Sequence, residues 1–123
     1  MYNVQFSVLY NYPSLANKDC ISIAILFFNI DTKECRLRTI SNWKRVQKFN
    51  DKLDIELVKL QLHGMEKEIH EIAKEPNFEL KDYTKFYVNV LKFSDVVEIK
   101  TTNFDEFVDK CSRQYLFSDY NKK

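Results

Sequence analysis

Residues 20–30 read CISIAILFFNI, and this stretch decides the fold of the chain. Its central part, IAILFF, is apolar at consecutive positions, so an extended strand here has two apolar faces. A strand of this kind needs cover on both sides and therefore lies at the centre of its sheet. The apolar run is far shorter than the ~20 residues that cross a bilayer, so we expect no membrane contact.

Strand patterns flank this central stretch on both sides. Residues 3–12 (NVQFSVLYNY) place apolar side chains at every second position, which predicts a half-buried strand that Pro13 ends. Residues 34–40 (ECRLRTI) alternate again. The polar connection at residues 31–33 is short, so it predicts a β-hairpin between this strand and the central one.

Two helical patterns come next. Ser41 is expected to cap a short helix over 42–49, and Asn50 or Asp51 a longer one that runs to about Lys74. One apolar stripe follows the longer helix at spacings of three and four: Ile55, Val58, Leu62, Met65, Ile69 and Ile72. A second stripe has the same spacing on another side: Leu53, Leu57, Leu60 and Gly64. This second side is either covered within the domain or free to contact a partner.

The last third of the chain predicts two strands and a helix. Residues 86–93 (FYVNVLKF) and 96–100 (VVEIK) are joined by an expected tight turn at Ser94-Asp95, and Thr102 or Asn103 caps the helix. The order β-β-β-α-α-β-β-α predicts an α+β fold. We expect an antiparallel or mixed sheet of about five strands, with the helices packed mainly on one face, in a single domain over residues 1–123.

Glycine is almost absent from the composition. Gly64 is the single glycine among 123 residues. Phosphate-binding loops need several glycines, because their backbone must approach the ligand closely, so the chain has no such loop. The codons of its abundant Phe, Tyr, Ile, Asn and Lys favour a low-GC bacterial or phage genome.

Charge and cysteine content point to a cytoplasmic protein without a cofactor. The net charge of +1 gives no global attraction to nucleic acid or anionic lipid, and the first residues lack the pattern of a secretion signal. Cys20, Cys35 and Cys111 are widely spaced and form no metal-ligand box, so we interpret them as small core residues.

Residues 33–48 form a basic strip with six basic residues against one acidic residue. Its candidate contact residues are Arg36, Arg38, Trp43, Lys44, Arg45 and Lys48. The strip could bind phosphates, with Trp43 as a stacking platform, or attract an acidic protein. A third interpretation is a solvated sheet face covered by arginine stems, with Trp43 anchoring the short helix to the core.

His63, Glu66 and His70 lie roughly on one side of the longer helix. Zinc sites on helices use histidines four residues apart. The gap of seven residues between these two histidines separates them by about 10 Å along the axis, so a solvated helix face is the favoured interpretation. A metal-dependent enzyme is therefore the most distant of the functional alternatives.

Apolar segments spread over nearly the whole chain also follow a known pattern. They are Phe6-Ser7-Val8-Leu9, Tyr12-Pro13, residues 19–28, Arg45-Val46-Gln47-Lys48-Phe49, Asp54-Ile55-Glu56-Leu57 and residues 89–94. Together they resemble the small bacterial proteins of the domain of unknown function 3037. Ser22 and Ala24 stand where that family usually has Asn and Gly. The resemblance implies no activity, and the HipA-like kinase genes near its members imply an accessory or regulatory partner.

These observations favour a non-enzymatic protein-interaction or regulatory module, from a bacterium or a mobile element. The second stripe (Leu53, Leu57, Leu60 and Gly64) is its expected contact surface, and a homodimer through this stripe is the simplest version. The alternative is a nucleic-acid-binding protein that uses the basic strip.

Overall fold

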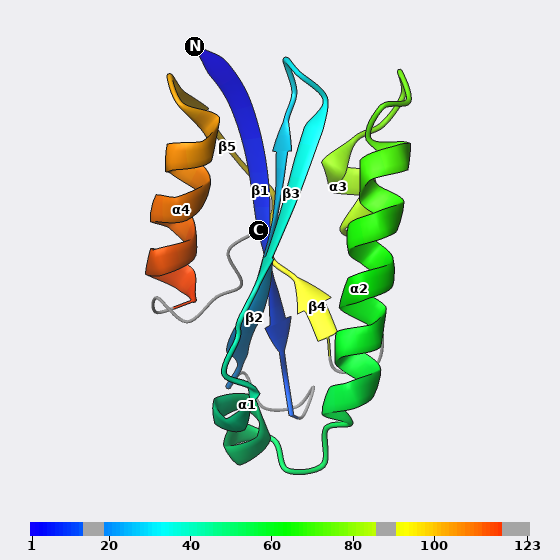
Figure 1. The fold of residues 1–123 in the computed structure, drawn as a ribbon, viewed down its shortest axis with the longest axis vertical. Helices are drawn as coiled ribbons and strands as arrows, with labels where there is room; N and C mark the ends of the chain where they lie inside the picture. Colours follow the sequence, from blue (N-terminus) through cyan, green and yellow to red (C-terminus); the bar gives the residue numbers. More distant parts are fainter. Residues whose placement is uncertain (14–18, 86–90, 117–123) are drawn as a thin grey trace.

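The computed structural model describes residues 1–13, 19–85 and 91–116 of the chain. Figure 1 shows a central sheet with helices around it. The strands are β1 (Tyr2–Asn11), β2 (Ile21–Asn29), β3 (Glu34–Thr39), β4 (Leu91–Phe93) and β5 (Val97–Thr101). The helices are α1 (Trp43–Phe49), α2 (Ile55–Ile72), α3 (Leu80–Tyr83) and α4 (Phe104–Tyr115). The α+β fold is confirmed, and α3 is a short additional helix that no sequence pattern predicted.

All strand pairs in the sheet are antiparallel, and the order is β3-β2-β1-β4, with β5 also paired to β1. The hairpin between β2 and β3 is confirmed, with Lys33 in the left-handed region at φ 64°. β1 shares the centre of the sheet with β2, because β2 pairs along one of its edges and β4 and β5 pair along the other.

Helices cover both faces of the sheet, which corrects the expectation that they pack mainly on one face. Phe27 of β2 meets Phe107 of α4 edge-to-face, with ring centroids 6.0 Å apart. The next residue, Phe28, meets Phe78 beside α3 in the same geometry at 4.9 Å. Consecutive strand residues point to opposite faces, so α4 lies on one face and α2 and α3 on the other (Figure 1). The two apolar faces of β2 require this double cover.

The predicted tight turn at Ser94-Asp95 is wrong. β4 and β5 do not form a hairpin; they follow one another along the same edge of β1, β4 opposite Leu9–Asn11 and β5 opposite Tyr2–Phe6. Between them the register shifts by one residue, as in a β-bulge. The first part of the predicted strand, residues 86–90, lies outside the described residues.

Ser94 explains why the chain can continue along this edge. Its N–H donates to the Val8 carbonyl at 2.7 Å, and its Oγ accepts from the Val8 N–H at 2.9 Å. The hydroxyl thereby replaces a backbone acceptor in the interrupted ladder. The buried Ser7 Oγ donates in turn to the Ser94 carbonyl at 2.6 Å.

The helix starts are set by side-chain caps, and two of them differ from expectation. Asn42 rather than Ser41 caps α1, and Asp54 caps α2 by accepting from the Leu57 N–H at 3.1 Å. Asn50 instead ends α1 and donates from its side chain to the buried Asn11 of β1 at 3.2 Å. Asn103 caps α4 as predicted.

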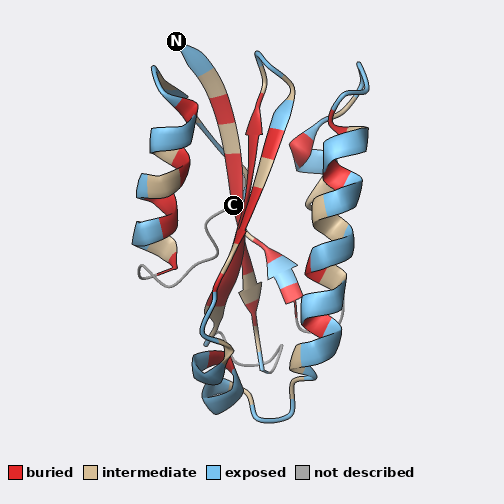
Figure 2. Cartoon of the chain, viewed as in Figure 1, coloured by how far each residue is buried: buried red, intermediate tan, exposed pale blue. Residues whose placement is uncertain are grey.

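The core follows from these two layers of cover. Every residue of β2 is buried or half-buried, and Figure 2 shows the buried residues of α2 and α4 turned toward the sheet. Val58, Leu62 and Ile69 are the buried members of the first stripe of α2, which confirms that stripe as the core-facing side.

Candidate functional site

The second stripe of α2 is exposed over most of its length. Leu57 is 47% exposed and Leu60 67% exposed, on a helix whose opposite side is held by the core. Leu53 differs, because it precedes the helix, is half-buried and packs against the core. Leu57, Leu60 and Gly64 are therefore not covered within the described part of the domain, and we refer to these three residues as the α2 patch.

Gly64 leaves open space at one end of the α2 patch. The residue is exposed, and a Cβ built on it would meet no atom within 4 Å. Close packing inside this domain therefore does not require a glycine here. The helix loses stability at this position without an internal contact that compensates for the loss.

A polar contact with α3 lies further along the same side of α2. Leu60, Gly64 and Glu68 are spaced by four residues and so follow one row of the helix surface. Glu68 hydrogen-bonds Tyr83 of α3. Burial raises the pKa of Tyr83 above its ordinary value, and the Glu68 carboxylate raises it further. Along this row the apolar residues are thus followed by a polar contact with α3.

The structure divides the basic strip between two places. Arg36 lies on the sheet face that α4 covers, where its guanidinium is 5.3 Å from the Phe104 ring centroid. It also contacts Glu34 at 2.9 Å and Asp105 at 3.6 Å, and the hydrogen bond lowers the pKa of Glu34. Arg38 is buried two residues further along the same strand. Arg36 is therefore held against α4, and Arg38 is a buried residue of the sheet.

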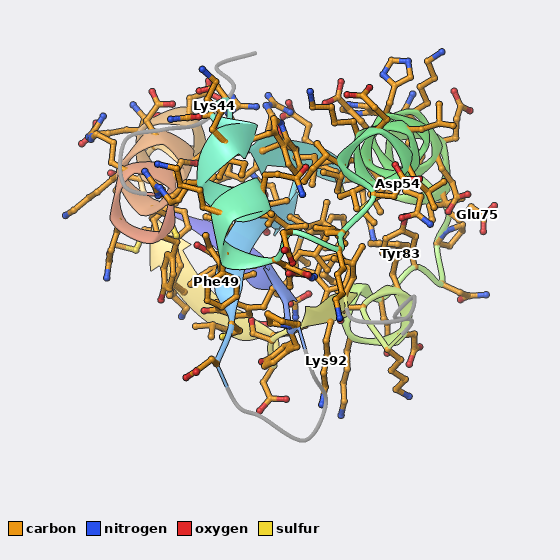
Figure 3. All side chains as sticks on the ribbon, turned by 90° about the horizontal axis from the view of Figure 1, so that it is seen from below. Lys44, Phe49, Asp54, Glu75, Tyr83 and Lys92 are labelled. Atoms are coloured by element: carbon orange, nitrogen blue, oxygen red, sulfur yellow. The ribbon has the colours of Figure 1, made fainter. Side chains whose placement is uncertain are left out.

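The remaining residues of the basic strip belong to α1, which lies at one end of the sheet (Figure 1). Lys44, Arg45 and Lys48 are exposed there, and Figure 3 shows Lys44 and Phe49 at opposite ends of this helix. Trp43 is half-buried, packs against the core and has the Lys59 ammonium 5.8 Å from its ring centroid. Trp43 thus connects α1 with α2, and its half-buried ring is a poor platform for stacked bases.

A groove that no sequence pattern predicted lies between α3 and the β4–β5 edge, with a volume of about 540 Å³. Its lining includes Lys81, Lys85 and Lys92, together with Ser94. Lys85 pairs with Asp82 at 3.2 Å. The four-residue spacing of Lys81 and Lys85 could have indicated that both line one surface, but only if residues 80–83 had been recognised as a helix.

His63 and His70 are exposed on α2, and Glu66 is half-buried. Within residues 1–13, 19–85 and 91–116, no group of three or more His, Cys, Asp or Glu side chains is placed to hold a metal ion. In the same residues, no helix combines the length and apolar character needed to cross a membrane.

Two of the three cysteines are core residues, as predicted. Cys35 and Cys111 are buried, and burial raises the pKa of each thiol to about 12. Both therefore stay protonated at neutral pH and are poor nucleophiles. Cys20 differs in being half-exposed.

Comparison with known proteins adds a family but no activity. The model of a family described as "Protein of unknown function (DUF3037)" matches residues 6–116. No curated protein and no solved structure matches the chain.

Proposed function

The chain belongs to the DUF3037 family, whose description gives no function, and we propose from its own surface that it is a non-enzymatic protein-interaction module. The observation that carries this proposal is the α2 patch. Leu57 and Leu60 are large apolar side chains, 47% and 67% exposed, and neighbours on one long helix. Exposed apolar residues grouped on a rigid element are typical of protein contact sites.

The geometry of α2 suits a helical contact. The helix spans 18 residues and is fixed by its buried stripe, so the α2 patch is presented without a cost for ordering the backbone. Gly64 lets the backbone of a partner approach within a short distance. The expected partner offers an apolar groove or an apolar helix face.

The partner is a second protein or a second copy of the chain. Family resemblance suggests a HipA-like kinase as the second protein, in the cytoplasm of a bacterium or encoded on a mobile element. A homodimer through the α2 patch is the simplest form, because it requires no other component.

The test compares Leu57→Asp and Leu60→Asp with the unchanged chain. Light scattering at micromolar concentration measures self-association, and a pull-down from the native host with mass spectrometry measures partner binding. Each substitution places a charge in the contact, so we expect binding to fall by tenfold or more, about 1.4 kcal/mol. Thermal unfolding should change little, since both side chains face solvent.

His70→Asp is the matched control, because His70 is exposed near the other end of the same helix and is not three or four residues from any member of the α2 patch. It should bind like the unchanged chain. A protein that is captured equally by all variants does not use the α2 patch. If neither self-association nor partner binding depends on Leu57 and Leu60, the proposal is wrong.

The alternative is nucleic-acid binding through α1. Three exposed basic residues on a helix of seven residues favour it: Lys44, Arg45 and Lys48. It predicts that single-stranded DNA binds at low salt, that binding weakens steeply as salt rises, and that Lys44→Glu with Lys48→Glu abolishes it. Absence of binding at 20 mM salt excludes this alternative.

A further inference from the structure

β5 lies at an edge of the sheet. Among the residues that the structure describes, β1 is the one strand paired with β5. Val97, Glu98 and Lys100 are exposed, and Ile99 is half-buried. α4, which follows β5 in the chain, packs on β1 and β2.

The backbone of β5 presents its free groups at alternate residues. The Asn3 carbonyl accepts from the Ile30 N–H at 2.9 Å, so the backbone groups of Asn3 point toward β2. Those of Val4 therefore point toward β5, where Val4 stands opposite Ile99. Ile99 uses its N–H and carbonyl in this pair, and the residues on either side of Ile99 direct theirs outward.

The two residues with outward backbone groups are Glu98 and Lys100, which carry opposite charges on one face of the strand. We propose that β5 pairs antiparallel with β5 of a second copy, about a two-fold axis at Ile99. In this register Glu98 of each copy stands opposite Lys100 of the other. The proposal concerns a surface separate from the α2 patch and does not depend on the function of that patch.

The sequence of β5 complements itself in this register. The outward groups of Glu98 and Lys100 form backbone hydrogen bonds with the second copy, and their side chains form two ion pairs related by the axis. Ile99 meets Ile99 of the second copy in a non-hydrogen-bonded pair, where side chains approach most closely. Val97, which is 45% exposed, gains cover opposite Thr101.

Charge on an edge strand usually prevents such pairing. If residues 98 and 100 carried the same charge, the β5 strands of the two chains would repel each other across the two-fold axis. One acid and one base, two residues apart, instead attract in the antiparallel register. The charges of β5 thus permit one alignment and oppose the parallel one, in which Glu98 would meet Glu98. The result is one continuous sheet through two copies.

The test uses charge reversal, with sedimentation velocity from 1 to 200 μM to measure dimerisation. We expect Glu98→Lys and Lys100→Glu each to weaken the dimer about tenfold or more, because two attractive pairs become repulsive. The double variant that exchanges both charges should dimerise like the unchanged chain. An equimolar mixture of the two single variants should form a heterodimer.

Gln5→Ala is the control for local structure. The Gln5 side chain donates to Glu98 at 3.1 Å, so this change removes that bond without altering charge, and the dimer should persist. Leu57→Asp should also leave this dimer intact. A monomer throughout the range, a dimer unaffected by single reversals, or failure of both the exchange and the mixture to restore it would overturn the proposal.

Discussion

At the scale of single residues, Gly64 links helix stability with contact. A glycine within a helix costs about 1 kcal/mol relative to alanine. In α2 this cost has no internal reason, because the position is exposed and has open space around it. A glycine is useful here if another chain packs against the helix backbone.

We therefore predict opposite effects of Gly64→Ala on stability and on binding. The free energy of unfolding should rise by about 0.5–1 kcal/mol, measured by urea denaturation, because alanine favours the helix. Binding at the α2 patch should weaken, because the added methyl group holds the partner away. His70→Ala, at an exposed position of α2 that is not three or four residues from any member of the α2 patch, is the control and should leave binding unchanged. Stabilisation without any loss of binding would show that the partner does not approach Gly64.

Helix caps could be predicted from the sequence where the capping hydrogen bond joins residues that are close along the chain. Of the two predicted caps of α4, Thr102 and Asn103, the structure uses Asn103, whose side chain accepts from the Glu106 N–H three residues on. Asn50 was misassigned because the buried Asn11, which is distant in sequence, holds its side chain. A cap that competes with a tertiary contact cannot be assigned from the sequence.

At the scale of elements, the spacing of apolar residues predicted which side of a strand or helix is buried, but not which elements lie next to each other in the fold. The apolar run of β2 and the buried stripe of α2 were predicted correctly, because burial of a face determines the spacing. The β4–β5 junction was not, because a Ser-Asp pair reads as a turn. Its actual role depends on the Ser94 hydroxyl, which completes the ladder to Val8.

The basic strip was continuous in sequence but not in space. Arg36 belongs to β3 and faces α4, whereas Lys44 and Lys48 belong to α1 at one end of the sheet. Strand and helix direct their side chains differently, so neighbouring residues separate when the chain passes from one to the other. The exposure of the α2 patch was left open by the sequence, because a second apolar stripe predicts either burial or contact.

At the scale of the whole molecule, two buried cysteine thiols make the free energy of unfolding depend on pH. Cys35 and Cys111 have pKa values of about 12 in the folded chain, against an ordinary value of 9. Above pH 9 the unfolded chain releases these protons while the folded chain keeps them. The unfolded state then binds fewer protons, so the free energy of unfolding falls as pH rises from 9 toward 12.

We predict a fall of up to about 1.4 kcal/mol per pH unit for each thiol in this interval. Urea denaturation between pH 8 and 10.5, with a reducing agent present, measures it. Cys111→Ala should lower the starting stability and reduce the slope by the share of one thiol. A free energy of unfolding that stays constant up to pH 10.5 would contradict the burial of these thiols.

The arrangement of helices is also a property of the whole molecule. The α+β class and the order of elements followed from the sequence, but α4 on the opposite face did not. The two apolar faces of β2 carried this information, since both needed a covering layer. What the pattern could not supply was the assignment of a particular helix to each face.

The position of β1 has a consequence for synthesis. Its second edge is completed by residues 91–101, which leave the ribosome about ninety residues after β1 does. Until then one edge of β1 has no hydrogen-bonding strand beside it. The pairing of β1 with residues 91–101 also closes a long loop, which slows folding. During this interval the segment is available to holding chaperones, and a translational stall before residue 91 would leave it exposed.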